Sequence, residues 1–425
     1  MKVTQPYKMK IYERVFDDTW SFWGADTKEF THKYHIYPAM MIPQVCRTLI
    51  EKYKPEGKLD MIFDPYCGSG TTLVEASLMG INSIGTDLNP LARLIARAKT
   101  THYNYSDISY QFHSIQGELT FYTEDKVINK NFDRITNYSF WYRDEDLLKL
   151  SYLQQLIDQF ANITTADFFN ICLAETVRDV SFTRNGEFKR FRIKQQSIEY
   201  FNPNTFDLFE RKVIRNMNGL KEFNSISKTT PTTKVCDFNS SIKIPSNIIA
   251  PQSIDMVITS PPYGDSQTTV AYGQFSRWAN EWFNYPNAKN LDKLLMGGTK
   301  EKGERFETIS IREVLDKIKA LDEKRYMEVS TFLNDYWESI HHVAETIRPE
   351  GIVCYVVGNR TVKGIQIPLD YFTAEMFEKC GFKHLTTIVR QIPNKRMPAK
   401  TSPTNKPGNK IDTMSKEFLV ILKKY

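Results

Sequence analysis

Short hydrophobic runs alternate with helical patterns near the start of the chain. Residues 59–100 read LDMIFDPYCGSGTTLVEASLMGINSIGTDLNPLARLIARAKT. The run MIF predicts a buried strand, and the apolar spacing of TTLVEASLM predicts a helix that ends at Gly80. A second short strand ends at Asp87, and a second helix covers 90–100. This order of strands and helices predicts an α/β fold.

A long segment, 101–233, interrupts this alternation. Residues 144–160 and 166–180 each have the apolar spacing of an amphipathic helix. The stretch SFTRNGEFKRFRIK predicts a hairpin that turns at Asn185–Gly186. A segment of this length with its own apolar faces predicts an inserted, mainly helical subdomain rather than a loop.

The α/β pattern resumes after the insertion. The chain then carries the strand pattern IDMVITSPPYG, a long helix at 330–351, and the strand IVCYVVGN. Two further strands, KHLTTIVRQIP and KEFLVILKKY, are joined by a loop rich in Pro, Lys and Asn. We therefore divide the chain into 1–100, 101–233 and 234–425.

Composition narrows the class of protein without deciding it. The 425 residues are 41% hydrophobic, which is enough for a large core, and Lys+Arg exceed Asp+Glu by 56 to 50. We expect no membrane span and no signal peptide, since the apolar runs are too short. The six cysteines lack paired metal spacing, so we expect no metal site and a cytoplasmic protein with reduced thiols.

The loop between the first two strands has the chemistry of a nucleotide-cofactor site. Gly68 and Gly70 allow close approach of the backbone, and Asp87 is placed to bind a ribose diol. The loop lacks the Lys of a phosphate-binding loop and the three glycines of a dinucleotide site. Asp64 would repel a pyrophosphate but attract an ammonium. A ligand with an ammonium, a ribose and an adenine but no phosphate is S-adenosylmethionine. The alternative is that the glycines serve tight packing alone.

Three motifs in consistent places resemble a known family. FDPYCGSGTT (63–72), TSPPY (259–263) and HIYPAMMIP (35–43) resemble the cofactor and catalytic motifs of S-adenosylmethionine-dependent DNA amino-methyltransferases. These enzymes modify the exocyclic nitrogen of cytosine (N4) or adenine (N6). The resemblance covers 30–100 and 232–425 and departs from the usual pattern at Tyr66, where phenylalanine is common.

The resemblance implies a fold and a set of cofactor residues. The fold would be Rossmann-like, with a mostly parallel seven-stranded sheet and an antiparallel last strand. Residues 1–100 would form the cofactor-binding half and 234–425 the catalytic half. Asp237 would hold the adenine amine, although an acid at a strand end is often only a cap. The expected cofactor-binding residues are Tyr37, Pro38, Asp64, Pro65, Tyr66, Cys67, Gly68, Ser69, Gly70, Thr71, Asp87, Leu88 and Asp237.

The Ser-Pro-Pro-Tyr motif also has a chemical rationale. An exocyclic amine is a poor nucleophile, because its lone pair is delocalised into the ring. Hydrogen bonds to Ser260 Oγ and the Pro261 carbonyl would favour the reactive amine, and Pro261 and Pro262 would fix the backbone. Tyr263 would stack on a base taken out of the duplex. The alternative is a Pro-Pro turn that carries a surface tyrosine.

The target base follows only from the resemblance. Family members with serine at the first motif position are mostly cytosine-N4 enzymes, so Ser260 favours cytosine N4 over adenine N6. Methylation at cytosine C5 is disfavoured, because no cysteine follows a proline in this chain. Three other readings remain: an RNA methyltransferase acting on guanine N2, a non-catalytic binding subunit, and a nuclease fused to a methylase.

Double-stranded DNA is the expected partner, and 101–233 is the main candidate for target recognition. The stretch 265–328 is a second candidate, and the motif order resembles the alpha subgroup, although the insertion precedes Asp237. A cognate restriction endonuclease is left open as a partner, and monomer versus homodimer is undecided. Two basic clusters would contact phosphates or merely be solvated. They are Arg184, Lys189, Arg190, Arg192 and Lys194 on the hairpin, and Arg390, Lys395, Arg396, Lys400, Lys406 and Lys410 near the C-terminal loop.

Overall fold

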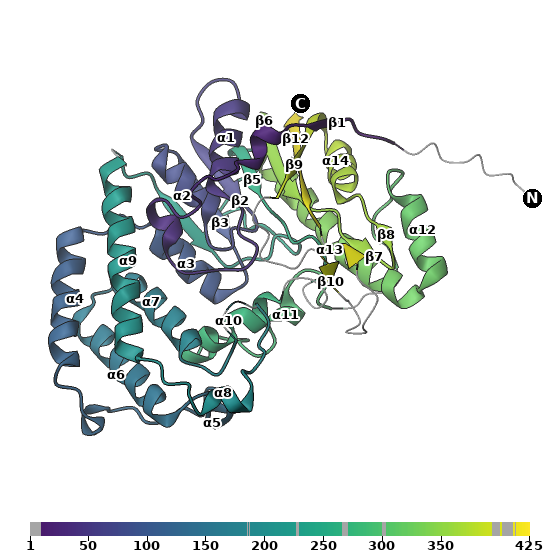
Figure 1. Cartoon of the computed structure of the whole chain (residues 1–425). Helices are drawn as coiled ribbons and strands as arrows, with labels where there is room; N and C mark the ends of the chain where they lie inside the picture. Colours follow the sequence, from purple (N-terminus) through teal and green to yellow (C-terminus); the bar gives the residue numbers. More distant parts are fainter. Residues whose placement is uncertain are drawn as a thin grey trace, which may run out of the picture.

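The computed structural model describes residues 10–184, 186, 188–226, 229–265, 271–299, 303–392, 400–401, 411–412 and 414–425. A large sheet forms the centre of one part of the molecule, and a helical subdomain lies beside it (Figure 1). In spatial order the strands of the sheet are β1 (Arg14–Phe16), β9 (Phe382–Gln391), β12 (Lys416–Lys424), β6 (Ile347–Val357), β5 (Ile254–Thr259), β2 (Met61–Asp64), β3 (Asn82–Thr86) and β4 (Thr233–Cys236).

The sheet has the predicted topology. Strands β4, β3, β2, β5 and β6 pair in parallel, whereas β12 lies antiparallel between β6 and β9. This arrangement confirms the Rossmann-like methyltransferase fold with an antiparallel last strand. The predicted number of seven strands was wrong by one in the described part of the chain, because β1 adds in parallel to the edge of β9. Its three residues were too few to give a strand pattern.

Alternate residues of the central strands face two different cores. Met256 and Ile258 of β5 pack in one core, and Val257 packs in the other. Strand β6 repeats the alternation with Cys354 on one face and Tyr355 on the opposite face. Such period-two burial is what a sheet covered on both faces requires.

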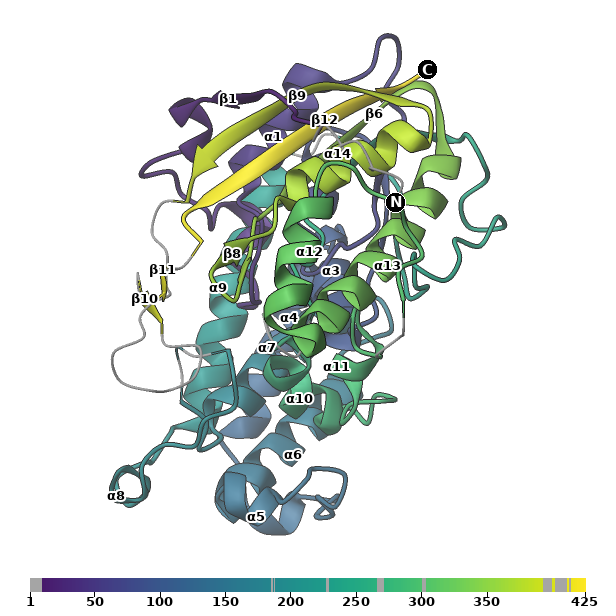
Figure 2. The same ribbon diagram turned by 90° about the vertical axis from the view of Figure 1, so that its right-hand side faces the viewer.

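Helices cover both faces of the sheet. The first core contains side chains of α1 (Pro43–Tyr53), and the second contains side chains of α12 (Arg312–Leu321), α13 (Glu323–Thr346) and α14 (Leu369–Lys379). Figure 2 shows α12, α13 and α14 beneath the long strands β6, β9 and β12. Helices α2 (Thr71–Leu78) and α3 (Pro90–Thr100) follow β2 and β3, as the sequence predicts.

The insertion folds into helices, and a helix that follows β5 joins it. Its helices are α4 (Tyr105–Leu119), α5 (Tyr138–Trp141), α6 (Asp144–Phe160), α7 (Ala166–Asp179), α8 (Gln195–Ile198) and α9 (Thr205–Ile226). Helix α10 (Tyr272–Trp282) packs into the same core through Trp278 and Trp282, which are almost fully buried. The helical subdomain therefore draws on chain from both sides of β5.

The predicted hairpin of 181–194 is reduced to one antiparallel bridge, between Thr183 and Arg192. Its basic side chains pack individually against aromatic rings: Arg190 lies over Trp278 and Arg192 over Phe140. This packing replaces the alternation that two full strands would need. The predicted turn residue Asn185 lies outside the described residues.

Short elements complete the described chain. They are η1 (Asp18–Ser21), η2 (Phe30–Lys33), η3 (Glu124–Lys126), α11 (Leu291–Leu294), β7 (Thr361–Val362), β8 (Ile365–Gln366), β10 (Lys400–Thr401) and β11 (Ile411–Asp412). Within the described residues, the structure contains no helix with the length and apolarity needed to span a membrane.

Candidate active site

Three neighbouring parallel strands end at the same edge of the sheet and bring their polar residues together. Asp64 is the last residue of β2, Asp87 follows β3, and Ser260 follows β5. Because β3, β2 and β5 are adjacent and parallel, these three residues share the carboxyl edge. This edge is where open α/β sheets bind their ligands.

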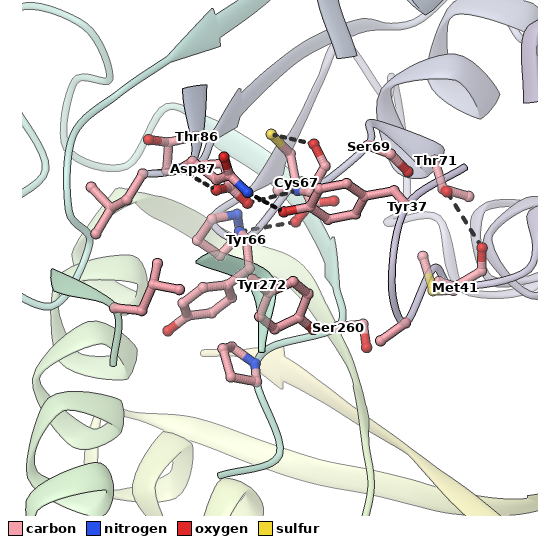
Figure 3. Close-up of a pocket in the computed structure, with 18 of the residues that line it drawn as sticks. Tyr37, Met41, Tyr66, Cys67, Ser69, Thr71, Thr86, Asp87, Ser260 and Tyr272 are labelled. Atoms are coloured by element: carbon pink, nitrogen blue, oxygen red, sulfur yellow. Dashed lines mark hydrogen bonds between the residues drawn. The ribbon is translucent and has the colours of Figure 1, made fainter. Parts of the chain in front are cut away.

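A cavity of about 1020 Å³, measured together with its opening to solvent, lies at this edge. Figure 3 shows Asp87, Cys67 and Tyr37 converging on the cavity, with Ser260 on its lower side in that view. The predicted cofactor residues that line the cavity are Tyr37, Pro38, Asp64, Pro65, Tyr66, Cys67, Gly68, Ser69, Thr71, Asp87 and Leu88.

Asp87 is held by backbone donors. The Gly68 N–H donates to Oδ2 at 3.1 Å, and the Asn89 N–H donates to Oδ1 at 2.7 Å. Burial raises the pKa of Asp87 to about 6. The two hydrogen bonds and the charge of nearby Arg93 act in the opposite direction, because they favour the ionised form. The carboxylate is thus fixed in position beside the cavity.

Asp64 is also buried, with only 3% of its surface exposed. Thr259 Oγ1 donates to Asp64 Oδ1 at 2.5 Å, and the Tyr66 N–H donates to the same oxygen at 3.1 Å. Burial raises the pKa of Asp64 to about 6, and the charge of Asp87 adds to this rise. A cationic ligand in the cavity would favour the ionised form of both acids.

Two predicted cofactor residues do not line the cavity. Gly70 caps α2 at φ +83°, and a Cβ there would lie 2.9 Å from Ala96 Cβ, so its small size serves helix packing. Asp237 is exposed and does not line the cavity, so the structure gives no support to its predicted contact with a cofactor. Cys236 points into the protein at the end of β4, so the next side chain points outward. Phe238 and Asn239 line the cavity instead.

The sequence patterns predicted Tyr37 but missed Asn89 and Tyr272, which complete a polar and aromatic wall with it. The Tyr37 ring stacks on Tyr272 with centroids 5.9 Å apart, and its hydroxyl accepts from Asn89 Nδ2 at 2.9 Å. Asn89 was visible as a helix cap before Pro90, because its side chain accepts from the Leu91 N–H. Tyr272 gave no signal, since α10 reaches the cavity only through tertiary packing.

The Ser-Pro-Pro-Tyr motif divides between two environments. Ser260 and Pro262 line the cavity, and Pro261 is buried. Tyr263 does not line it: its ring packs beside Gly358, where an added Cβ would lie 2.6 Å from ring carbon Cδ2. Its hydroxyl lies 3.0 Å from Ser260 Oγ. The motif is therefore part of the site, and stacking of a base on Tyr263 stays a prediction.

Comparison with known proteins decides the family. A family model described as DNA methylase matches residues 1–97. The Type II methyltransferase M.MvaI of Kocuria varians is 40% identical over 98% of this chain and 96% of its own length.

The chain belongs to the S-adenosylmethionine-dependent DNA amino-methyltransferases.

Two more distant similarities accompany this match. The Type II methyltransferase M.BsoBI of Geobacillus stearothermophilus is 21% identical and covers 88% of this chain and 84% of its own length. The solved rRNA methyltransferase aviRa of Streptomyces viridochromogenes overlaps 91% of this chain and 86% of its own, with 9% identity and a TM-score of 0.32.

The predicted DNA-binding residues of this amino-methyltransferase lie in different settings. Arg184 and Lys189 are exposed, whereas Arg190 is half-buried against Trp141 and Trp278. Burial lowers the pKa of Arg190 to about 10. Arg192, besides lying over Phe140, donates to the Phe140 carbonyl at 2.9 Å. The two arginines therefore have packing roles in addition to any contact with DNA.

The second basic cluster is largely outside the described residues. Lys395 and Arg396 lie there, and so do Lys406 and Lys410. Arg390 was wrongly placed in this surface cluster: it sits in β9 with 3% of its surface exposed. Its guanidinium is engaged by Glu417 and by the Trp20 carbonyl, so it is not part of an exposed basic surface.

Proposed function

We propose that this DNA amino-methyltransferase modifies the N4 amine of cytosine at a specific site in duplex DNA. One observation carries the proposal: a single cavity joins the two acidic strand ends to Ser260 of the Pro-Pro motif. A cofactor held by the acids would lie next to the residue that receives the target amine. The full-length similarity to a Type II methyltransferase supports DNA as the substrate.

The residues of the cavity fit S-adenosylmethionine. Asp64 would face its ammonium, Asp87 its ribose diol, and Leu88 and Phe238 would contact the adenine. Two buried carboxylates with raised pKa values are what a cationic ligand would stabilise. When bound, the cofactor supplies an electrophilic methyl group. Ser260 Oγ and the Pro261 carbonyl then orient the amine toward that methyl group.

The position of Ser260 supports base flipping. It lies at a recessed strand end, and a base stacked within a duplex cannot reach such a place. The target nucleotide must therefore leave the stack, at a cost of about a few kcal/mol. The helical subdomain would hold the surrounding duplex, with Lys189 among its exposed basic residues.

Sequencing of host DNA tests the proposal. The protein is expressed in a host without DNA methylation of its own, and N4-methylcytosine and N6-methyladenine are distinguished base by base. We expect N4-methylcytosine in one sequence context and none with Ser260→Ala. N6-methyladenine in that context would replace the cytosine assignment. Unmodified DNA from folded, cofactor-binding protein would contradict DNA methylation, and methylated guanine in host tRNA would point to RNA instead.

A partner endonuclease belongs to the same proposal. A site-specific methyltransferase similar to Type II enzymes would protect host DNA from an endonuclease that cuts the same sequence. Once the modified context is known, DNA from the expressing host should resist cleavage at that sequence. Cleavage equal to that of unmodified DNA would contradict a role in restriction and modification.

A further inference from the structure

A chain of hydrogen bonds leads from the cavity to a carboxylate on the antiparallel strand. Ser260 Oγ lies 3.0 Å from the Tyr263 hydroxyl, and that hydroxyl donates to Glu417 Oε1 at 3.1 Å. Because the tyrosine proton points to Glu417, its oxygen accepts from Ser260. The lone pairs of Ser260 Oγ then remain available to a donor in the cavity.

The far end of this chain is fixed by an ion pair. Arg390 Nε donates to Glu417 Oε2 at 3.0 Å, and Arg390 also donates to the Trp20 carbonyl at 3.0 Å. Glu417 and Arg390 are directly opposite each other on β12 and β9. Oε2 is thus occupied, and Oε1 is left to the tyrosine. The Glu417 side chain is 19% exposed, so a proton that reaches it can pass to water.

Methylation of an amine creates a need for such a chain. As the nitrogen bonds to the methyl carbon, the carbon–sulfur bond breaks with its electron pair on sulfur, and positive charge develops on the amine. The amine must lose one proton to become the neutral product. A serine hydroxyl cannot keep that proton, because protonated alcohols are strong acids. An acceptor beyond Ser260 is therefore required.

We propose that Glu417 is the final proton acceptor of this reaction, reached from the target amine through Ser260 and Tyr263. This inference rests on the proposed function. The amine N–H bond breaks and an O–H bond forms at Ser260, whose own proton moves to Tyr263. The tyrosine proton moves to Glu417 Oε1, which becomes a carboxylic acid. Ser260 and Tyr263 end neutral, and the acid later releases its proton to water.

The surroundings of Tyr263 favour a phenol that passes a proton on over a phenol that is ionised to a phenolate. Burial, followed by the charge of Glu417, raises the pKa of Tyr263 well above its usual range. The phenol therefore stays protonated and can only pass a proton while it receives another. Stacking alone would need only the aromatic ring, so phenylalanine at 263 separates the two roles.

Single-turnover methyl transfer to a cognate duplex tests the relay with two variants. Glu417→Gln can accept the tyrosine hydrogen bond but cannot hold the proton, and Tyr263→Phe leaves the Glu417–Arg390 pair intact. We expect each to slow methyl transfer by about 10²-fold with unchanged cofactor affinity, and the double variant to be no slower. The solvent deuterium isotope effect of the wild type should disappear in both. Glu350→Gln, which removes a carboxylate paired with Lys423 of β12, is the matched control.

A second readout needs neither DNA nor cofactor. With 3-fluorotyrosine at position 263, the fluorine NMR chemical shift of the phenol can be compared between wild type and Glu417→Gln. The groups that face it are Ser260, Glu417 and Tyr272. Loss of the Glu417 charge, which accepts the hydrogen bond of this phenol, should change that chemical shift. An unchanged chemical shift would show that the two side chains do not interact.

The outcomes separate the relay from the proposed function. Wild-type rates in Tyr263→Phe or Glu417→Gln would overturn the relay while leaving DNA methylation intact. Loss in Glu417→Gln alone would also overturn it, because Glu417 would then act through Arg390 and the sheet. A wild-type protein that binds cofactor but methylates no DNA would instead overturn the proposed function.

Discussion

Asp64 and Asp87 illustrate how a ligand site is prepared at the level of single residues. Both carboxylates are buried at adjacent strand ends, and the charge of Asp87 adds to the raised pKa of Asp64. Titratable groups whose pKa values are shifted by burial and by neighbouring charges cluster at functional sites. In the free protein each acid is half-protonated near pH 6. An ammonium facing Asp64 would favour loss of its proton, and ribose hydroxyls that donate to Asp87 would favour its ionised form.

We predict that cofactor affinity falls as the pH is lowered through about 6, the pKa of both acids. The ammonium would bind ionised Asp64, and the ribose hydroxyls would donate to ionised Asp87. Protonation below that pH therefore competes with binding, and binding near pH 6 releases protons. Calorimetry in buffers of different ionisation enthalpy measures both effects. An affinity that stays constant from pH 8 to pH 5 would contradict the assignment.

Asp64→Asn and Asp87→Asn should each weaken cofactor binding. A hydrogen bond to a charged group contributes roughly 1.5–3 kcal/mol, which corresponds to about 10- to 150-fold in affinity. Asp237→Asn is the matched control, because Asp237 is exposed and does not line the cavity. Calorimetry on the three variants decides: equal affinities in Asp64→Asn and the control would remove Asp64 from the site.

At the scale of elements, local signals were readable from the sequence and contacts between distant segments were not. β2, the glycine loop and β3 follow one another within a few residues, so apolar runs and turn residues predicted them. Tyr272 and Glu417 reach the site from segments far along the chain, and no local pattern marks them. The prediction of a full hairpin at 181–194 was wrong for a related reason, because aromatic rings elsewhere in the chain decide how its arginines pack.

Lys189 and Arg190 should respond differently to replacement. Lys189 is exposed, so Lys189→Ala should lower the salt slope of DNA binding by about one unit if it contacts a phosphate. Arg190 packs on two tryptophans, so Arg190→Ala should also lower the free energy of unfolding, by about 0.5–2 kcal/mol. Fluorescence titrations over a salt series and chemical denaturation measure the two quantities. An unchanged salt slope in Lys189→Ala would show that Lys189 is a solvated surface residue that contacts no phosphate.

At the scale of the whole molecule, the sheet and the helical subdomain meet at buried polar groups. Lys99 of α3 is 1% exposed, and its pKa is lowered to about 7, first by burial and then by the charge of Arg215 on α9. Arg215 in turn pairs with Glu175 of α7 at 2.7 Å. Charge at this junction therefore depends on how the two parts pack.

We predict that the stability of the protein rises between pH 7 and about 10, and that Lys99→Met reduces this rise. The folded pKa of about 7 lies below the ordinary 10.5, so in this window the unfolded chain binds a proton that the folded chain has lost. The free energy of unfolding then increases with pH, by at most roughly 1.4 kcal/mol per unit. Denaturant titrations across this range measure it. The same slope in both proteins would show that Lys99 is charged when folded.

The antiparallel strand β12 has a consequence for synthesis on the ribosome. It fills the gap between β6 and β9, although both of those strands are translated before it. Until residues 416–424 have left the ribosome, the nascent chain must expose two unpaired strand edges. Such edges promote aggregation and the binding of chaperones. Glu417 arrives with the same strand. Under the proposed relay, a chain still being translated could not modify the genome that encodes it.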